Sequence, residues 1–124
     1  MVNPTESEKV IGRIVTVTVD RPLGSVHPEY ADLVYSVNYG FVDGIVGGDG
    51  DWQDAYILGV NEPVSTFTGV VIAVIVREND VETKWVVAPE GINFSQKQIA
   101  DAVNFQEQYF RITILTLNST GDWQ

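Results

Sequence analysis

Three aspartates, Asp49, Asp51 and Asp54, stand close together in the segment GGDGDWQDAYIL, directly before an apolar run. Aspartate and glycine suit the backbone angles of turns, so the segment could simply join two strands. If the turn directs the three carboxylates to one side, their mutual repulsion would raise their pKa values unless cations lie between them. Mg²⁺ binds through such carboxylates together with water and substrate phosphates, which makes the cluster a candidate metal site.

A second acidic group lies in RENDVETKWVVAP, where Asp80 and Glu82 are followed by Lys84. Side chains two positions apart in an extended chain share a side, so Glu82 and Lys84 are expected to face the same site. Acidic and basic groups would then meet at the junction of two predicted strands. Arg77 and Glu78, just before this group, are interpreted as a solvated strand end.

Composition limits the partners of this site. The chain of 124 residues fits one domain, residues 1–124, and its 7 basic against 17 acidic residues give a formal charge of −10. This charge argues against nucleic acid and membrane surfaces as partners. The sequence contains no cysteine, so a metal would be bound by oxygen ligands or by His27, which favours hard cations such as Mg²⁺. His27 itself is interpreted as a hydrogen-bonded or exposed loop residue.

No stretch of the chain approaches the roughly 20 apolar residues that cross a membrane. The first residues, MVNPTESEKV, also lack the basic start and apolar stretch of a secretion signal. The expected location is therefore the cytoplasm.

Six segments are predicted to be strands that carry these side chains. Residues 14–19, IVTVTV, alternate apolar and threonine side chains with the period of two that is typical of a half-buried strand. Prolines and glycines in residues 21–40 indicate a loop, with a short extended piece near residues 33–35. The spacing of the strands favours a small barrel or a sandwich. The other five segments are residues 41–46, 53–60, 70–77, 84–88 and 111–117.

One helix is predicted between the last two strands. Ser95 and Gln98 form a capping-box signature at its start. Ile99, Val103 and Phe110 then give an inward apolar stripe, which predicts that the helix runs to Phe110 and lies against the sheet.

Four segments together resemble the soluble (type I), magnesium-dependent inorganic pyrophosphatases. They are YSVNYGF at residues 35–41, the run DGDWQD at residues 49–54, DVETKWVVAP and FQEQYF. The similarity spans about residues 15–111 and is most specific at the Asp-x-Asp-x-x-Asp signature. It implies a mainly β (α+β) fold, a small OB-like closed barrel with one C-terminal helix packed against it. It also implies hydrolysis of pyrophosphate to two phosphates with two or more Mg²⁺ ions, by a chain that forms a homo-oligomer.

The resemblance assigns roles to residues by position. Asp51 would activate the attacking water. The metal ions would be held by four carboxylates: Asp49, Asp54, Asp80 and Glu82. Phosphate would be contacted by four further side chains: Arg21, Tyr39, Lys84 and Tyr109. These roles suit the charge of the chain, because an acidic cleft repels pyrophosphate until bound cations reverse the local field.

Some positions depart from the family pattern. A metal-binding Glu and a phosphate-binding Lys of an N-terminal hairpin have only Glu8, Lys9 and Arg13 as candidates, and Phe110 stands where the family has another phosphate-binding Lys. Trp52 replaces the usual Pro of the signature. Two alternatives therefore stay open: a non-catalytic phosphate-binding, metabolite-binding or regulatory protein derived from the family, and a phosphohydrolase acting on a larger phosphoanhydride.

Overall fold

The computed structural model describes residues 9–48, 50–78 and 82–116, which form one six-stranded sheet and one helix. Each predicted strand and the predicted helix is present, with bounds that differ by a few residues. For example, β3 stops before residue 60, because Gly59 takes a left-handed backbone conformation there. The elements are β1 (Ile14–Arg21), β2 (Asn38–Val46), β3 (Trp52–Ile57), β4 (Thr66–Arg77), β5 (Thr83–Ala88), α2 (Gln96–Glu107) and β6 (Ile112–Thr116).

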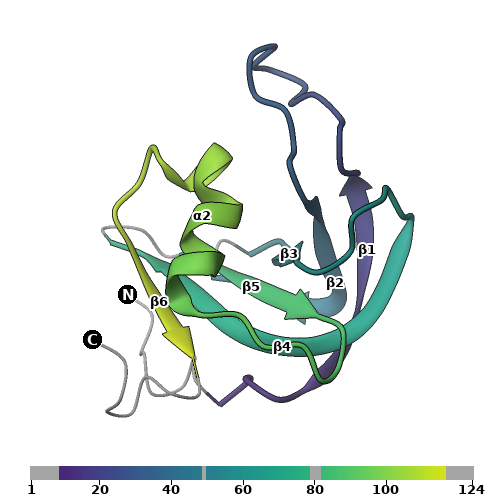
Figure 1. The fold of residues 1–124 in the computed structure, drawn as a ribbon, viewed down its shortest axis with the longest axis vertical. Helices are drawn as coiled ribbons and strands as arrows, with labels where there is room; N and C mark the ends of the chain where they lie inside the picture. Colours follow the sequence, from purple (N-terminus) through teal and green to yellow (C-terminus); the bar gives the residue numbers. More distant parts are fainter. Residues whose placement is uncertain (1–8, 49, 79–81, 117–124) are drawn as a thin grey trace.

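Five of the strands close into a barrel. Their order is β1-β2-β3-β5-β4, and β4 pairs with β1 to complete the ring (Figure 1). The β3–β5 pair is parallel and the other pairs are antiparallel. β6 extends the sheet on the free side of β4. Closure removes the unpaired edges that an open sheet of five strands would expose, and it confirms the expected mainly β, OB-like closed barrel.

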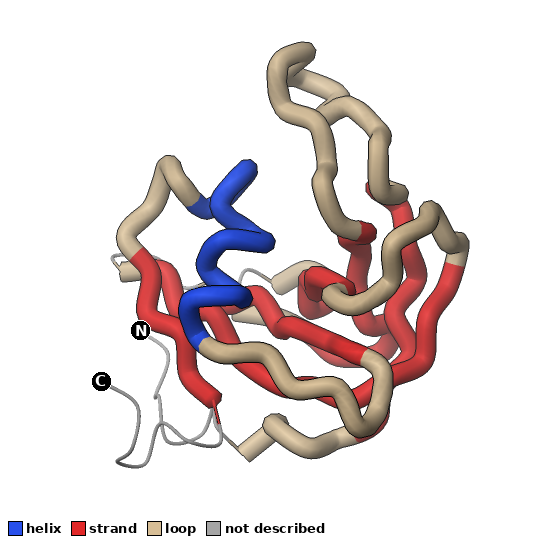
Figure 2. The backbone as a smooth tube through the Cα atoms, viewed as in Figure 1, coloured by secondary structure: helices blue, strands red, loops and turns tan. Residues whose placement is uncertain are grey.

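The strands next to the helix are buried on both faces. Along β5, Trp85 and Val87 join the core cluster to which all five barrel strands contribute, whereas Val86 joins a second cluster that includes Ile99 and Val103 of α2. This alternation follows from the two-residue period of a strand. The helix therefore packs on the outer face of the barrel, as Figure 2 shows.

The helix begins as the sequence predicts. Ser95 is the N-cap, and both hydrogen bonds of the capping box with Gln98 are formed. The helix ends earlier than predicted, however, at Glu107, and the expectation that Phe110 continues the inward stripe is wrong. Phe110 follows a turn after the helix and is 43% exposed. The last inward position belongs instead to Glu107, because a buried arginine lies opposite it.

The close approach of β1 and β2 explains why position 40 of the barrel is a glycine. Gly40 pairs with Val19, and a Cβ atom at position 40 would lie 1.9 Å from the carbonyl oxygen of Thr18. We therefore expect Gly40→Ala to lower the free energy of unfolding by about 3 kcal/mol, at the upper end for overpacking, because the obstacle is backbone. Urea denaturation measures the change. Asp43→Ala, at an exposed position of the same strand, should stay within about 0.5 kcal/mol, and equal stability of the two variants would contradict the close approach.

The segment between β1 and β2 protrudes from the barrel (Figure 1). It contains one isolated bridge, between Val26 and Val34, which confirms the short extended piece expected near residues 33–35. No helix in the described ranges is long and apolar enough to cross a membrane.

Candidate functional site

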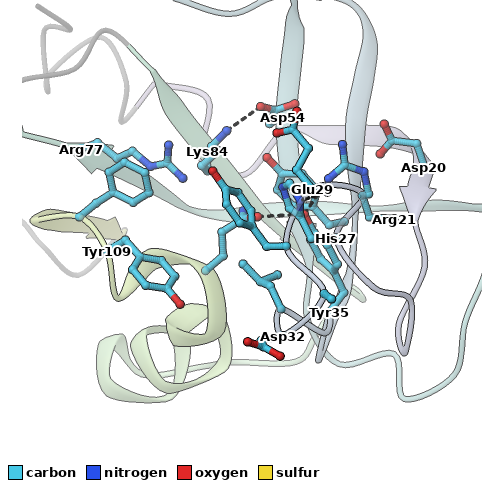
Figure 3. A pocket seen from close by; sticks show the side chains of 16 residues that line it. Asp20, Arg21, His27, Glu29, Asp32, Tyr35, Asp54, Arg77, Lys84 and Tyr109 are labelled. Carbon is cyan, nitrogen blue, oxygen red and sulfur yellow. Dashed lines mark hydrogen bonds and ion pairs between the residues drawn. The ribbon is translucent and has the colours of Figure 1, made fainter.

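A cleft of about 870 Å³ lies between the protruding β1–β2 segment, the barrel and the C-terminal end of α2 (Figure 3). Its basic lining residues are Arg21, Arg77 and Lys84, and acidic side chains such as Asp20 and Asp54 lie among them. Both signs of charge therefore face the same space. A volume of this size is in the range of clefts that bind small molecules.

Lys84 links two carboxylates on the barrel side of the cleft. Its Nζ atom lies 2.6 Å from Oδ2 of Asp54 and 2.9 Å from Oε2 of Glu82. The parallel register of β3 and β5 sets the Asp54 contact, because Ala55 pairs with Trp85. The lysine side chain is only 5% exposed, whereas those of Asp54 and Glu82 are 30% and 26% exposed. The two carboxylates thus meet around one positive charge, and of these three residues Asp54 and Lys84 line the cleft.

Burial and neighbouring charges shift the pKa values of Lys84 and Tyr39. Burial alone would lower the pKa of Lys84, but the neighbouring Tyr39 and Asp54 outweigh it and raise the pKa, so the ammonium stays charged. Burial also raises the pKa of Tyr39, whose ring centre lies 5.6 Å from Nζ of Lys84. At neutral pH the cleft therefore presents a charged lysine beside a neutral tyrosine hydroxyl.

A chain of hydrogen bonds begins on the other side of the cleft, at Arg21. Its Nη1 atom donates to the hydroxyl of Tyr35 at 2.8 Å, and this hydroxyl donates to Oε1 of Gln106 at 2.9 Å. Nε2 of Gln106 donates to the hydroxyl of Tyr56 at 2.7 Å. The Tyr56 hydroxyl donates to Oε2 of Glu107 at 2.6 Å. Helix α2 is thus connected by side chains to β1 and β3.

The chain ends at a buried ion pair that the sequence interpretation missed. Arg77 donates from Nε to Oε1 of Glu107 at 3.0 Å and from Nη2 to Oε2 at 2.7 Å. Arg77 is 6% exposed, so its interpretation as part of a solvated strand end is wrong, although Glu78 is exposed. A signal for Glu107 was present, since it follows the buried Val103 by one helical turn.

Asp20 was also missed. It precedes Arg21 at the end of β1 and lines the cleft. Burial raises the pKa of its carboxyl, the charge of Arg21 opposes this shift, and Asp54 adds to it. Asp20 and Asp54 are therefore close enough to influence each other electrostatically.

Comparison with protein-family models and with curated proteins found no match to the chain. Solved structures do match it. An inorganic pyrophosphatase from Ehrlichia chaffeensis has a TM-score of 0.65 and 17% identity over 90% of this chain and 91% of that one. One from Coxiella burnetii has a TM-score of 0.61 and 18% identity over 89% and 88% of the two chains. The chain has the inorganic pyrophosphatase fold.

A third pyrophosphatase structure, from Neisseria gonorrhoeae, has a TM-score of 0.58 and 22% identity over 79% of this chain and 74% of that one. Since these identities are low, the likeness is one of fold. The pyrophosphatase fold is thus shared over most of the chain, and it agrees with the resemblance found in the sequence.

Some of the predicted site residues line the cleft and others do not. Arg21, Tyr39, Lys84 and Tyr109 all line the cleft, and Tyr109 is 70% exposed. Asp54 and Glu82 both contact Lys84. Asp51 is exposed at the start of β3 and is not among the lining residues. Two further predicted metal ligands, Asp49 and Asp80, lie outside the described residues.

The two carboxylates in contact with Lys84 suit a hard divalent cation. Asp54 and Glu82 already contact one cationic atom, Nζ of Lys84, and carboxylate oxygens are the ligands that Mg²⁺ prefers. In the described part of the chain, no group of three histidine or acidic side chains is close enough to hold a metal. A magnesium ion at this point would therefore be held by Asp54 and Glu82 together with water and substrate oxygens.

Proposed function

We propose that residues 1–124 form one domain that hydrolyses inorganic pyrophosphate to two phosphates with Mg²⁺. The observation that carries this proposal is the contact of Asp54 and Glu82 with the single Nζ atom of Lys84, on a cleft that also contains Arg21. The two carboxylates can bind a cation, and Lys84 and Arg21 beside them can attract phosphate. The fold supports it, since the matching structures are those of inorganic pyrophosphatases.

Each metal ligand in this proposal is a carboxylate. Asp54 and Glu82 would hold one ion, and Asp49 and Asp80 are proposed as additional ligands for a second. Bound Mg²⁺ supplies positive charge to phosphate oxygens and lowers the pKa of a water. Asp51 would accept the proton of the attacking water, the role of a general base.

The remaining groups hold the substrate. Lys84 carries a fixed positive charge, and Tyr39 presents a neutral hydroxyl that can donate to a phosphate oxygen. Arg21 and Tyr109 would contact phosphate from other parts of the cleft lining. These preorganised donors would stabilise the negative charge that develops on the leaving phosphate. We further propose that the protein works in the cytoplasm as a homo-oligomer.

The test is phosphate release from pyrophosphate by the purified protein, with and without Mg²⁺, beside a panel of nucleotides. We expect release from pyrophosphate that requires Mg²⁺ and is abolished by a chelator. Asp51→Asn should lower the rate about 10²- to 10⁴-fold, because the base is lost while Mg²⁺ binding is kept. Asp43→Asn, at an exposed position outside the cleft lining, is the matched control and should leave the rate unchanged.

Other outcomes would favour the alternatives. Release from nucleotides but not from pyrophosphate would indicate a phosphohydrolase for larger anhydrides. No release from any substrate, with phosphate compounds still bound, would indicate a non-catalytic binding protein.

A further inference from the structure

Arg77 is a buried cation at the edge of the cleft. Glu107 binds two of its three guanidinium nitrogens, at 3.0 Å and 2.7 Å, and the arginine side chain is 7% exposed. The Glu107 carboxylate is in turn held by the hydroxyl of Tyr56. Two parallel hydrogen bonds fix the plane of a guanidinium group, so Arg77 has a defined orientation.

Phe110 fixes the same group from a second direction. The Cζ atom of Arg77 lies 3.7 Å from the centre of the Phe110 ring, which is the arrangement of a cation–π contact. Both residues line the cleft, and Figure 3 shows Arg77 near Lys84. Contacts at its edge and on its face therefore hold the guanidinium group of Arg77 at the cleft.

The third nitrogen, Nη1, has no close acceptor among the described residues. Its recorded ion-pair partner is Oε1 of Glu82 at 3.6 Å, which is too long for a hydrogen bond. Arginine carries its charge at any accessible pH, so this nitrogen is a permanent donor. A buried donor on a cleft-lining residue, whose ion-pair partner lies 3.6 Å away, points to an anionic ligand.

We propose that Nη1 of Arg77 donates to a phosphate oxygen of the ligand that occupies the cleft, and that Arg77 and Arg21 bind the two ends of a bisphosphate anion. Glu107 and Phe110 are positioning residues for Arg77. That the anion is pyrophosphate rests on the proposed function, whereas the Arg77 contact itself does not.

The hydrogen-bond chain described above supports a two-ended ligand. It runs from Arg21 through Tyr35, Gln106 and Tyr56 to Glu107, and so joins the two arginines through the helix. In Figure 3, Arg77 and Arg21 lie on opposite sides of Lys84. A rigid connection of this kind holds two donors at a constant separation, which favours a ligand with two charged groups.

Calorimetric titration with pyrophosphate, and with the non-hydrolysable methylene bisphosphonate, both in Mg²⁺, tests the proposal. Three variants are compared with the unchanged protein. Arg77→Lys keeps the positive charge but loses the planar guanidinium group that binds Glu107 through two nitrogens. The double variant Arg77→Gln with Glu107→Gln removes both charges, so neither side chain is left buried with an unpaired charge. Phe110→Leu removes only the ring support at an exposed position, so folding should be unaffected. Lys97→Gln, which removes one charge from an exposed helix position, is the control.

We expect at least tenfold weaker binding for both Arg77 variants, about threefold weaker binding for Phe110→Leu, and a change below twofold for Lys97→Gln. If hydrolysis is measurable, KM should rise more than kcat falls. Binding within twofold of the unchanged protein in all three variants would overturn the proposal, as would an absence of anion binding in the unchanged protein. Binding that depends on Arg77 without any hydrolysis would instead reject the proposed function and keep this inference.

Discussion

Glu107→Gln should lower the free energy of unfolding by about 3 kcal/mol, near the range measured when one partner of a buried ion pair is removed. The carboxylate binds two nitrogens of Arg77 and accepts from the Tyr56 hydroxyl, and its side chain is 1% exposed. A glutamine has one acceptor oxygen and no charge, so the buried guanidinium would lose its counter-ion. In a chain of this length the thermal midpoint should fall by roughly 10 °C.

Two comparisons separate this effect from a general effect of mutation. Glu78→Gln removes an acid at an exposed position next to Arg77 and should change stability by less than about 0.5 kcal/mol. Replacing the pair together, as Arg77→Met with Glu107→Leu, should recover much of the loss because neither charge is then stranded. A Glu107→Gln protein as stable as the unchanged one would show that the ion pair does not form in solution.

The strands could be predicted because their signal is local. The alternation in β1 and the turn residues that separate the later strands are all visible within a few positions. Closure of the barrel has no such local signal. The β1–β4 pair and the parallel β3–β5 pair join segments far apart in the sequence, so strand spacing alone left a barrel and a sandwich equally open. The choice of a barrel depended on the resemblance to a known family.

The site was partly predictable for the same reason. Glu82 and Lys84 were expected to share a side because they are two residues apart, and their side chains do form an ion pair. Arg77 and Glu107 belong to elements distant in the sequence, and each looks like a surface residue until α2 docks on the barrel. The position of Arg77 also helps to explain why Phe110 can stand where the resemblance leads one to expect a lysine. The guanidinium of Arg77 stacks on the ring of Phe110, so a positive charge is present beside this position.

Lys84→Met should impair both function and stability, because Lys84 is both a proposed phosphate ligand and the counter-ion of Asp54 and Glu82. We expect the hydrolysis rate to fall at least 100-fold, as for loss of a preorganised electrostatic contact to the reacting group. Without Mg²⁺ the variant should also lose about 2 kcal/mol of stability. This is less than for a fully buried pair, because the two carboxylates are partly exposed and screened by solvent.

The response of this variant to Mg²⁺ distinguishes a metal site from an ordinary ion pair. In the unchanged protein a divalent cation competes with the ammonium of Lys84 for Asp54 and Glu82. In Lys84→Met the two carboxylates lose this shared charge and repel each other, so a bound cation relieves more repulsion there. Added MgCl₂ should therefore raise the thermal midpoint of Lys84→Met more than that of the unchanged protein. Lys97→Met, which removes an exposed lysine paired with Asp101, should respond as the unchanged protein does. If Mg²⁺ leaves the midpoints of all three proteins unchanged, Asp54 and Glu82 do not bind the cation and the proposed metal site is rejected.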